Sequence, residues 1–234
     1  PVQAKDEQGR FIRQQSSFRN WITADGSAGP TGKGGFKAEA GRYRLYVALI
    51  CPWASRTLIA RKLKGLEDTI SVSVVEPALT SQGWRFGDYP GSTRDAVNGA
   101  TYTHELYTRA DPHFTGRATV PVLWDEQTDT MVSNESADIV RMFNTAFADL
   151  IPGKPDLYPA NLATDIDALN AEVYDRLNNG VYKAGFASSQ GAYDEAVAGV
   201  FATLDRLEDR LTGDYLFGDR FTETDIRLFV TLIR

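Results

Sequence analysis

The first half of the chain alternates between short apolar runs and segments with a helical period. Residues 45–50 are an apolar run, which is typical of a buried strand. The next stretch, residues 55–66, repeats apolar side chains every three or four positions, and this spacing predicts a helix. Residues 69–75 alternate polar and β-branched side chains, the pattern of a second strand. Together these segments predict a strand–helix–strand unit.

The pattern continues with a short helix, a hairpin and a further helix. We expect the helix at residues 102–110, the two hairpin strands at residues 118–124 and 130–132, and the next helix N-terminus at residues 133–136. The resulting order, β-α-β followed by α and then β-β-α, is the thioredoxin topology. This part of the chain is therefore predicted to be an α/β, thioredoxin-like domain.

The second half of the chain predicts helices without strands between them. Residues 162–178 and 193–211 are long helical stretches, and a third helix begins at Thr222, which can form a capping box with Asp225. We therefore divide the chain into three parts: a glycine-rich extended arm at 1–40, the thioredoxin-like domain at 41–148 and an all-helical domain at 157–234. Both chain ends are expected to be incomplete.

Cys51 lies where the first strand meets the first helix. Pro52 then takes the first helical position, where its missing N–H costs nothing. Backbone N–H groups and the positive end of the helix dipole point at such a position and favour a thiolate over a thiol. This context is similar to the active-site turn of thioredoxins and glutaredoxins, so we interpret Cys51 as a reactive cysteine. The alternative is a small buried side chain without chemistry.

Cys51 is the only cysteine of the chain, and Ala54 stands where the thioredoxin turn has its second cysteine. An internal dithiol cycle is therefore excluded. Any disulfide of Cys51 must be formed with another molecule, and an external thiol must release it.

Charge and composition narrow the classes of partner. A net charge of -6 argues against nucleic acid or an anionic membrane surface as the main partner. No apolar run approaches the length of a membrane span. A single cysteine agrees with a reducing cytoplasm. His104 and His113 do not show ligand spacing with Cys51, so we expect no metal site.

Several segments resemble those of one family over nearly the whole chain. The chain is similar to the glutathionyl-hydroquinone reductases, the Xi class of glutathione transferases, in the segments Cys51-Pro52-Trp53-Ala54, Gly83-Trp84-Arg85-Phe86, Thr119-Val120-Pro121-Val122-Leu123-Trp124-Asp125, Val132-Ser133-Asn134-Glu135-Ser136, Asn178-Asn179-Gly180-Val181-Tyr182-Lys183-Ala184-Gly185-Phe186-Ala187 and Asp225-Ile226-Arg227-Leu228. This resemblance implies a thioredoxin-like domain followed by an all-α glutathione transferase C-terminal domain, and a homodimer paired through the helical domains.

The resemblance also implies an activity with glutathione as co-substrate. Cys51 would attack the sulfur of a glutathionyl-hydroquinone, giving a mixed disulfide with glutathione and the free hydroquinone, and a second glutathione would regenerate Cys51. The competing interpretation is an omega-like thioltransferase or dehydroascorbate reductase, which also uses one cysteine. A third is a non-catalytic protein on the same scaffold.

The chemistry of a few side chains and the family resemblance both predict a glutathione site in the thioredoxin-like domain. Pro121 interrupts a strand, so we expect a cis Val120–Pro121 bond that presents the Val120 backbone to the tripeptide. Glu135 can bind the ammonium of the γ-glutamyl group, and Ser136 at a helix N-terminus can bind its carboxylate. For Glu135 and Ser136 the alternative is helix capping alone.

Trp84 lies in a long loop rich in glycine and proline, and ordered loops of that length are often functional. The resemblance places Trp84 over the tripeptide; the alternative is a loop anchor. It also implies that Tyr174 and Tyr182 line an aromatic acceptor site between the domains, where a phenol can deliver a proton. For both tyrosines the alternative is interdomain packing.

Overall fold

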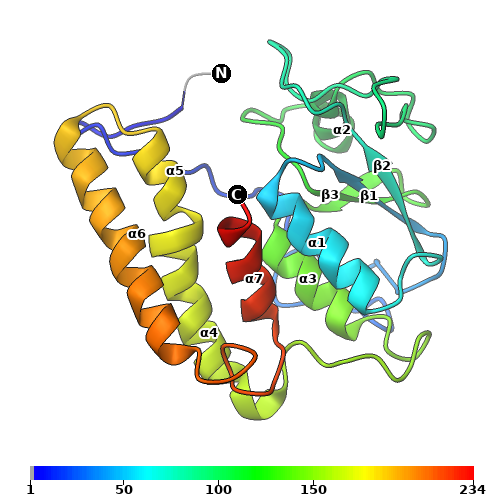
Figure 1. The fold of residues 1–234 in the computed structure, drawn as a ribbon. Coiled ribbons are helices and arrows are strands. Elements are labelled where there is room, and N and C mark those ends of the chain that lie inside the picture. The colour runs from blue at the N-terminus through cyan, green and yellow to red at the C-terminus, as the bar shows by residue number, and fades with distance from the viewer. Residues whose placement is uncertain (1–2) are drawn as a thin grey trace. The chain divides into compact units, whose positions relative to one another are not determined.

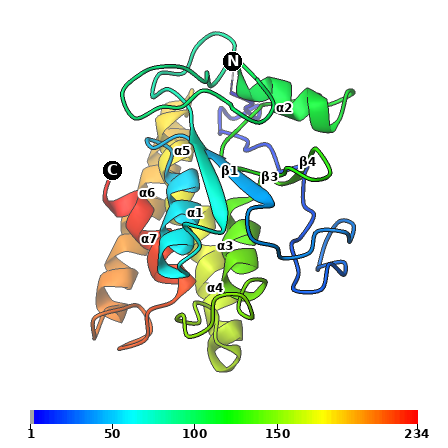
Figure 2. The same ribbon diagram turned by 90° about the vertical axis from the view of Figure 1, so that its right-hand side faces the viewer.

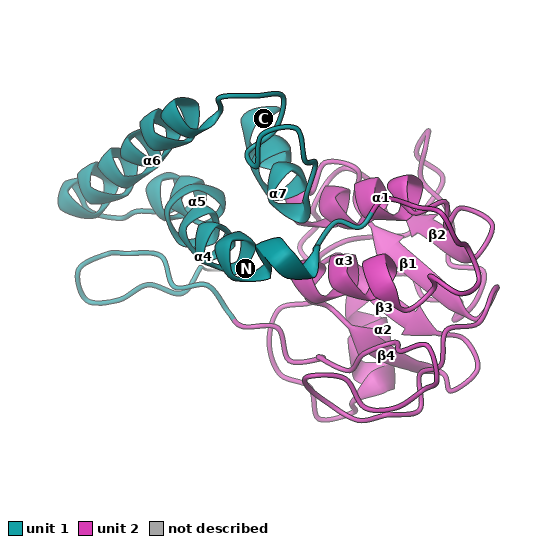
Figure 3. Ribbon diagram, turned by 90° about the horizontal axis from the view of Figure 1, so that it is seen from below, with its two compact units in different colours: residues 1–14, 156–234 teal, residues 15–155 magenta. Residues whose placement is uncertain are grey.

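The computed structural model describes residues 3–234. The chain divides into two compact units, Gln15–Pro155 and a second formed by Pro1–Gln14 with Asp156–Arg234 (Figure 3). The boundary at Gln14 divides the segment that we expected to be a single arm. Its first residues belong to the helical unit and the rest to the unit that contains the sheet.

The sheet unit is built on four strands. The strands are β1 (Tyr43–Val47), β2 (Ile70–Val74), β3 (Val122–Asp125) and β4 (Thr130–Ser133). Their order in the sheet is β2-β1-β3-β4 (Figure 3), with β1 parallel to β2 and antiparallel to β3. The sequence-based prediction of a thioredoxin-like sheet is therefore confirmed.

Three helices pack on this sheet. They are α1 (Pro52–Leu63), α2 (Thr103–Ala110) and α3 (Ser136–Thr145), and α1 lies side by side with α3 (Figure 1). The fully buried side chains of α1 are Ala54, Arg56, Thr57 and Ala60, while Leu58 and Ile59 are only half-buried. Apart from Arg56, the buried residues of α1 are therefore small, although its helical period was predicted from the larger apolar residues.

A segment of the arm covers the open edge of the sheet. The backbone N–H of Asn20 donates to Val132 O at 2.9 Å, and Arg19 pairs antiparallel with Ser133. The strand β4 is the last of the sheet order, so this pairing satisfies backbone groups that an edge strand would leave open.

The helical unit contains one long helix and a chain of shorter ones. These are a 3₁₀ turn (Ala160–Leu162), α4 (Ala163–Glu172), a π-helical segment (Val173–Asn178), α5 (Gly180–Gly185), α6 (Gln190–Arg210) and α7 (Glu223–Leu232). Its core is made by Val173, Leu177, Val200, Leu207 and Leu216. Thr222 and Asp225 form the predicted capping box of α7. The π-helical segment and α5 were not predicted, because we expected one helix to end at Asn178.

The first residues of the chain are fastened to this helical unit. Ser188 N donates to Gly9 O at 3.0 Å, and the guanidinium of Arg10 forms an ion pair with Glu195 at 2.8 Å.

None of the helices within residues 3–234 combines the length and apolar character that crossing a bilayer requires.

Candidate functional site

Cys51 is the N-cap residue of α1. Its backbone is extended, with φ -84 and ψ 117, and Pro52 follows at the first helical position. The residue as a whole is half-buried. Its Sγ lies 3.6 Å from the carbonyl oxygen of Val120, within the range of an S–H···O hydrogen bond. The structure therefore brings the candidate nucleophile against the candidate backbone-binding residue.

The Val120–Pro121 bond is cis, as predicted from the position of this proline. Val120 itself is 4% exposed. The preceding residue is held by Tyr107, whose hydroxyl donates to Thr119 O at 2.9 Å and accepts from Thr119 N at 3.1 Å. Asn134 Nδ2 donates to the same hydroxyl at 3.1 Å.

Tyr107 therefore joins the loop before Val120 to the residue before Glu135. Burial raises the pKa of Tyr107, so the hydroxyl stays neutral and keeps its donor proton. No sequence pattern indicates this connection, because Tyr107 appears only as one residue of the short helix predicted at residues 102–110.

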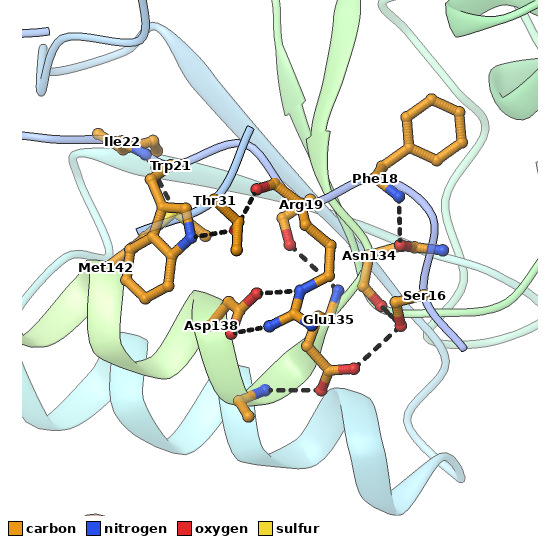
Figure 4. Close-up of polar contacts among 12 residues, drawn as sticks. Ser16, Phe18, Arg19, Trp21, Ile22, Thr31, Asn134, Glu135, Asp138 and Met142 are labelled. Carbon is orange, nitrogen blue, oxygen red and sulfur yellow. Dashed lines mark hydrogen bonds and ion pairs between the residues drawn. The ribbon is translucent and has the colours of Figure 1, made fainter. Parts of the chain in front are cut away.

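Glu135 is the N-cap of α3, and Ser136 is the first residue of that helix. The Oε1 atom of Glu135 accepts from Ala137 N at 3.1 Å, which is the capping interaction considered above. Its Oε2 atom accepts from the hydroxyl of Ser16 at 3.0 Å (Figure 4). Capping thus uses one carboxylate oxygen, while the other faces the arm.

Ser136 is 3% exposed and lies next to a buried arginine that our sequence reading missed. The NH1 group of Arg56 donates to Ser136 Oγ at 3.4 Å, and the guanidinium lies 4.5 Å from the centre of the Trp53 ring. A buried cation beside a helix N-terminus makes this region electropositive, which suits a carboxylate ligand. The only sequence sign was an arginine five positions after Cys51.

Trp84 is half-buried in the long loop between β2 and α2, the teal coil at the top of Figure 2. Its carbonyl oxygen accepts from Thr103 N at 3.0 Å, which ties it to the start of α2. Farther along the loop, Asp95 accepts hydrogen bonds from Tyr46 Oη at 2.9 Å and from Ala100 N at 3.2 Å. The loop is thus tied to β1 through Tyr46 and to α2 through Thr103.

Tyr174 and Tyr182 lie in the helical unit, whereas the five other candidate residues lie in the sheet unit. Tyr174 is 38% exposed in the π-helical segment. Tyr182, on α5, has the guanidinium of Arg13 over its ring at 4.4 Å and stacks with Phe11 at 6.4 Å. The π-helical segment that contains Tyr174 is a type of helix irregularity that often occurs at functional sites.

Residues 3–234 contain no group of three or more His, Cys, Asp or Glu side chains that could hold a metal ion.

Comparisons with known proteins agree with this geometry. The model of the glutathione S-transferase N-terminal domain matches residues 50–146, and that of the C-terminal domain matches residues 190–234. The protein named glutathionyl-hydroquinone reductase YqjG, from Escherichia coli (strain K12), is 60% identical over 232 residues, which are 98% of this chain and 71% of YqjG. The chain belongs to the Xi class of glutathione transferases.

Solved structures support the same assignment. The glutathione-bound structure of YqjG superposes on this Xi-class chain with a TM-score of 0.91, over 93% of this chain and 71% of YqjG. The Xi transferase of Phanerochaete chrysosporium is 53% identical, with a TM-score of 0.90 over 95% of this chain and 74% of that protein. By sequence alone, a Schizosaccharomyces pombe protein with a different name, glutathione S-transferase omega-like 2, is 49% identical, over 97% of this chain and 72% of its own length.

Proposed function

We propose that this chain reduces glutathionyl-hydroquinones to hydroquinones at the expense of glutathione. In the first step the Cys51 thiolate attacks the glutathione sulfur of the substrate. A Cys51–glutathione disulfide forms, the carbon–sulfur bond breaks, and the ring carbon takes the electron pair and a proton. In the second step a glutathione thiolate attacks the mixed disulfide, which releases oxidised glutathione and Cys51.

The observation that carries this proposal is the position of Cys51. A single half-exposed cysteine caps a helix and lies 3.6 Å from the Val120 carbonyl oxygen, beside the cis-proline. A helix N-terminus favours the thiolate, which is the nucleophilic form. Because the chain has only one cysteine, the resolving thiol must be supplied by a second glutathione.

Four residues of the sheet unit are proposed to bind glutathione. The backbone of Val120 would pair with the peptide part, and Trp84 would cover the tripeptide. Glu135 would bind the γ-glutamyl ammonium, and Ser136 its carboxylate. This last assignment is supported by the Arg56 guanidinium, which adds positive charge beside Ser136. Tyr174 and Tyr182 are proposed to bind the hydroquinone and to deliver the proton to the ring carbon.

The experiment that tests the proposal uses glutathionyl-menadiol with an excess of glutathione. The wild-type protein should release menadiol and oxidised glutathione in equal amounts, and Cys51→Ser should release neither. Without added glutathione, one menadiol per protein and a glutathione adduct on Cys51, detected by mass spectrometry, are expected. Turnover by Cys51→Ser would reject the mechanism.

The omega-like alternative makes a different prediction. A thioltransferase or dehydroascorbate reductase would reduce dehydroascorbate and leave glutathionyl-menadiol unchanged. Conjugation of glutathione to an activated aryl halide should also be weak, because that reaction needs a hydroxyl to stabilise the glutathione thiolate, whereas Cys51 would consume glutathione as a disulfide partner. Strong conjugation by the wild-type protein would count against the proposal.

We further propose that the chain works as a cytoplasmic homodimer without nucleic-acid or membrane partners. The net charge of -6 supports the absence of nucleic-acid and membrane partners, and the single cysteine supports the cytoplasm. The dimer is proposed from the family resemblance. Light scattering should give twice the chain mass of 25.8 kDa, and a monomer mass would reject the dimer. Cell fractionation should recover the protein with the cytosol.

A further inference from the structure

Ser16 is an arm residue that contacts the proposed glutathione site. Its hydroxyl lies 3.0 Å from Glu135 Oε2 and 3.3 Å from Asn134 O (Figure 4). Ser16 and Glu135 are 119 positions apart in the sequence. The contact therefore depends on how the arm folds against α3, and no local sequence pattern indicates it.

The two oxygens of the Glu135 carboxylate are held from opposite directions. Oε1 accepts from Ala137 N at 3.1 Å, and Oε2 accepts from Ser16. Two hydrogen bonds remove the rotational freedom of the side chain and leave further lone pairs on both oxygens. Glu135 and Ser16 are both half-buried, so the carboxylate remains accessible from solvent.

The arm that carries Ser16 is itself fixed to the sheet unit. Phe18 N donates to Asn134 Oδ1 at 3.2 Å, and Asn134 N donates to Phe18 O at 3.1 Å. Arg19 forms a bidentate ion pair with Asp138, which lies on the first turn of α3 (Figure 4). Its Nε donates to Oδ2 at 2.6 Å and its NH2 to Oδ1 at 2.8 Å. Three residues after Ser16, the chain is therefore anchored to the helix that presents Glu135.

We infer that Ser16 is a positioning residue for recognition of the glutathione ammonium. It holds the Glu135 carboxylate in the orientation that binds this group before the ligand arrives, so less freedom is lost on binding. The inference rests on the proposed role of Glu135, and it adds the arm to the glutathione site. Because Ser16 acts through Glu135, it should affect the affinity for glutathione and not the rate of the chemical steps.

The test measures equilibrium binding of S-methylglutathione by calorimetry, which involves no turnover. A second ligand has glutaryl in place of γ-glutamyl and so lacks only the ammonium. Ser16→Ala should weaken S-methylglutathione binding by about 3- to 10-fold, the net effect of one ordinary hydrogen bond, because Ser16 does not itself contact the ligand. It should leave the affinity for the glutaryl analogue unchanged, and Ser16→Thr, which keeps the hydroxyl, should restore wild-type binding.

Thr31→Ala is the matched control, because Thr31 is an arm hydroxyl that bonds to Arg19 O and Trp21 Nε1 and does not touch Glu135. It should bind both ligands as the wild type does, which excludes general loosening of the arm. Steady-state assays should show a raised KM for glutathione in Ser16→Ala with kcat unchanged.

Two results would overturn the inference. Ser16→Ala could bind S-methylglutathione like the wild type, or it could lose both ligands equally. The variant Glu135→Gln distinguishes failure of the inference about Ser16 from failure of the proposed glutathione site. If Glu135→Gln weakens only the ligand with the ammonium while Ser16→Ala is silent, the role of Glu135 stands and that of Ser16 fails. If Glu135→Gln is silent as well, both assignments fail.

Discussion

The Sγ of Cys51 lies 3.6 Å from the carbonyl oxygen of Val120. A thiol can donate a hydrogen bond to this oxygen, whereas a thiolate cannot. The N-terminus of α1 acts in the opposite sense, because its N–H groups and dipole favour negative charge on the N-cap residue. These two interactions act on the ionisation of Cys51 in opposite directions.

We expect the helix N-terminus to dominate, since the carbonyl contact is at the long end of hydrogen-bond range. The rate of Cys51 alkylation by iodoacetamide should then rise to its plateau at a lower pH than the rate for glutathione in the same buffer. Mass spectrometry of the intact protein measures this rate. A rate curve displaced to higher pH than that of glutathione would show that the carbonyl contact dominates.

Tyr174→Phe and Tyr182→Phe separate the proposed proton delivery from substrate binding. If one phenol delivers the proton to the hydroquinone ring, its removal should lower kcat by at least about tenfold, while the KM for glutathione stays unchanged. Tyr193→Phe is the control, because this tyrosine is 46% exposed on α6 and has no proposed role. Wild-type kcat in both variants would assign these tyrosines to packing.

The buried ion pair of Arg42 and Asp125 should make stability depend on pH. Nε and NH2 of Arg42 donate to the two oxygens of Asp125 at 2.9 and 2.6 Å. Burial raises the pKa of Asp125, but the hydrogen bonds from Arg42, Thr128 and the backbone of Gln127, together with the charge of Arg42, outweigh burial and hold this pKa below its usual value. A lowered pKa in the folded state means that the stabilisation is complete above the unfolded pKa and is lost as pH falls through the folded value.

Asp125→Asn should therefore lower the free energy of unfolding by about 3 kcal/mol near neutral pH, because it removes the buried partner of Arg42 and leaves only the longer ion pair with Glu39 at 3.5 Å. The difference from the wild type should begin to shrink below about pH 4, where Asp125 of the unfolded wild type binds a proton, and should go on shrinking as the pH falls through the lowered pKa of the folded state. Urea unfolding over this pH range measures it. Asp88→Asn, in an exposed pair with Arg94, is the control and should change stability little. A difference that stays constant with pH would contradict the assignment.

The local pattern of the sequence was sufficient for the parts of the fold that depend on neighbouring residues. Pro52 at the first helical position and the cis bond at Pro121 follow from short-range rules. The strand before Cys51 was also predicted, but it ends at Val47, and Leu49 and Ile50 lie exposed in a turn that the apolar run did not indicate. A helical period does not distinguish an α-helix from a π-helix, so the segment Val173–Asn178 was expected to be regular.

The contacts that organise the candidate site join residues far apart in sequence, and no pattern indicates them. Tyr107 reaches Asn134 across 27 positions, and Ser16 reaches Glu135 across 119. A charged residue within a helix is ordinarily read as solvent-facing, and for this reason Arg56 was missed although it is 1% exposed.

Arg56 offers the most direct test of this hidden part of the site. Its guanidinium lies 4.5 Å from the centre of the Trp53 ring and donates to Ser136 Oγ at 3.4 Å. A lysine keeps the charge but loses the flat guanidinium that stacks on an aromatic ring and holds several donors in a fixed plane. We therefore expect Arg56→Lys to lower the free energy of unfolding by about 2 kcal/mol and to weaken S-methylglutathione binding through Ser136. Arg94→Lys, on an exposed arginine, should change neither quantity. If Arg56→Lys were as stable as the wild type and bound S-methylglutathione equally well, charge alone would be sufficient at this position and the stacked, hydrogen-bonded geometry would have no energetic role.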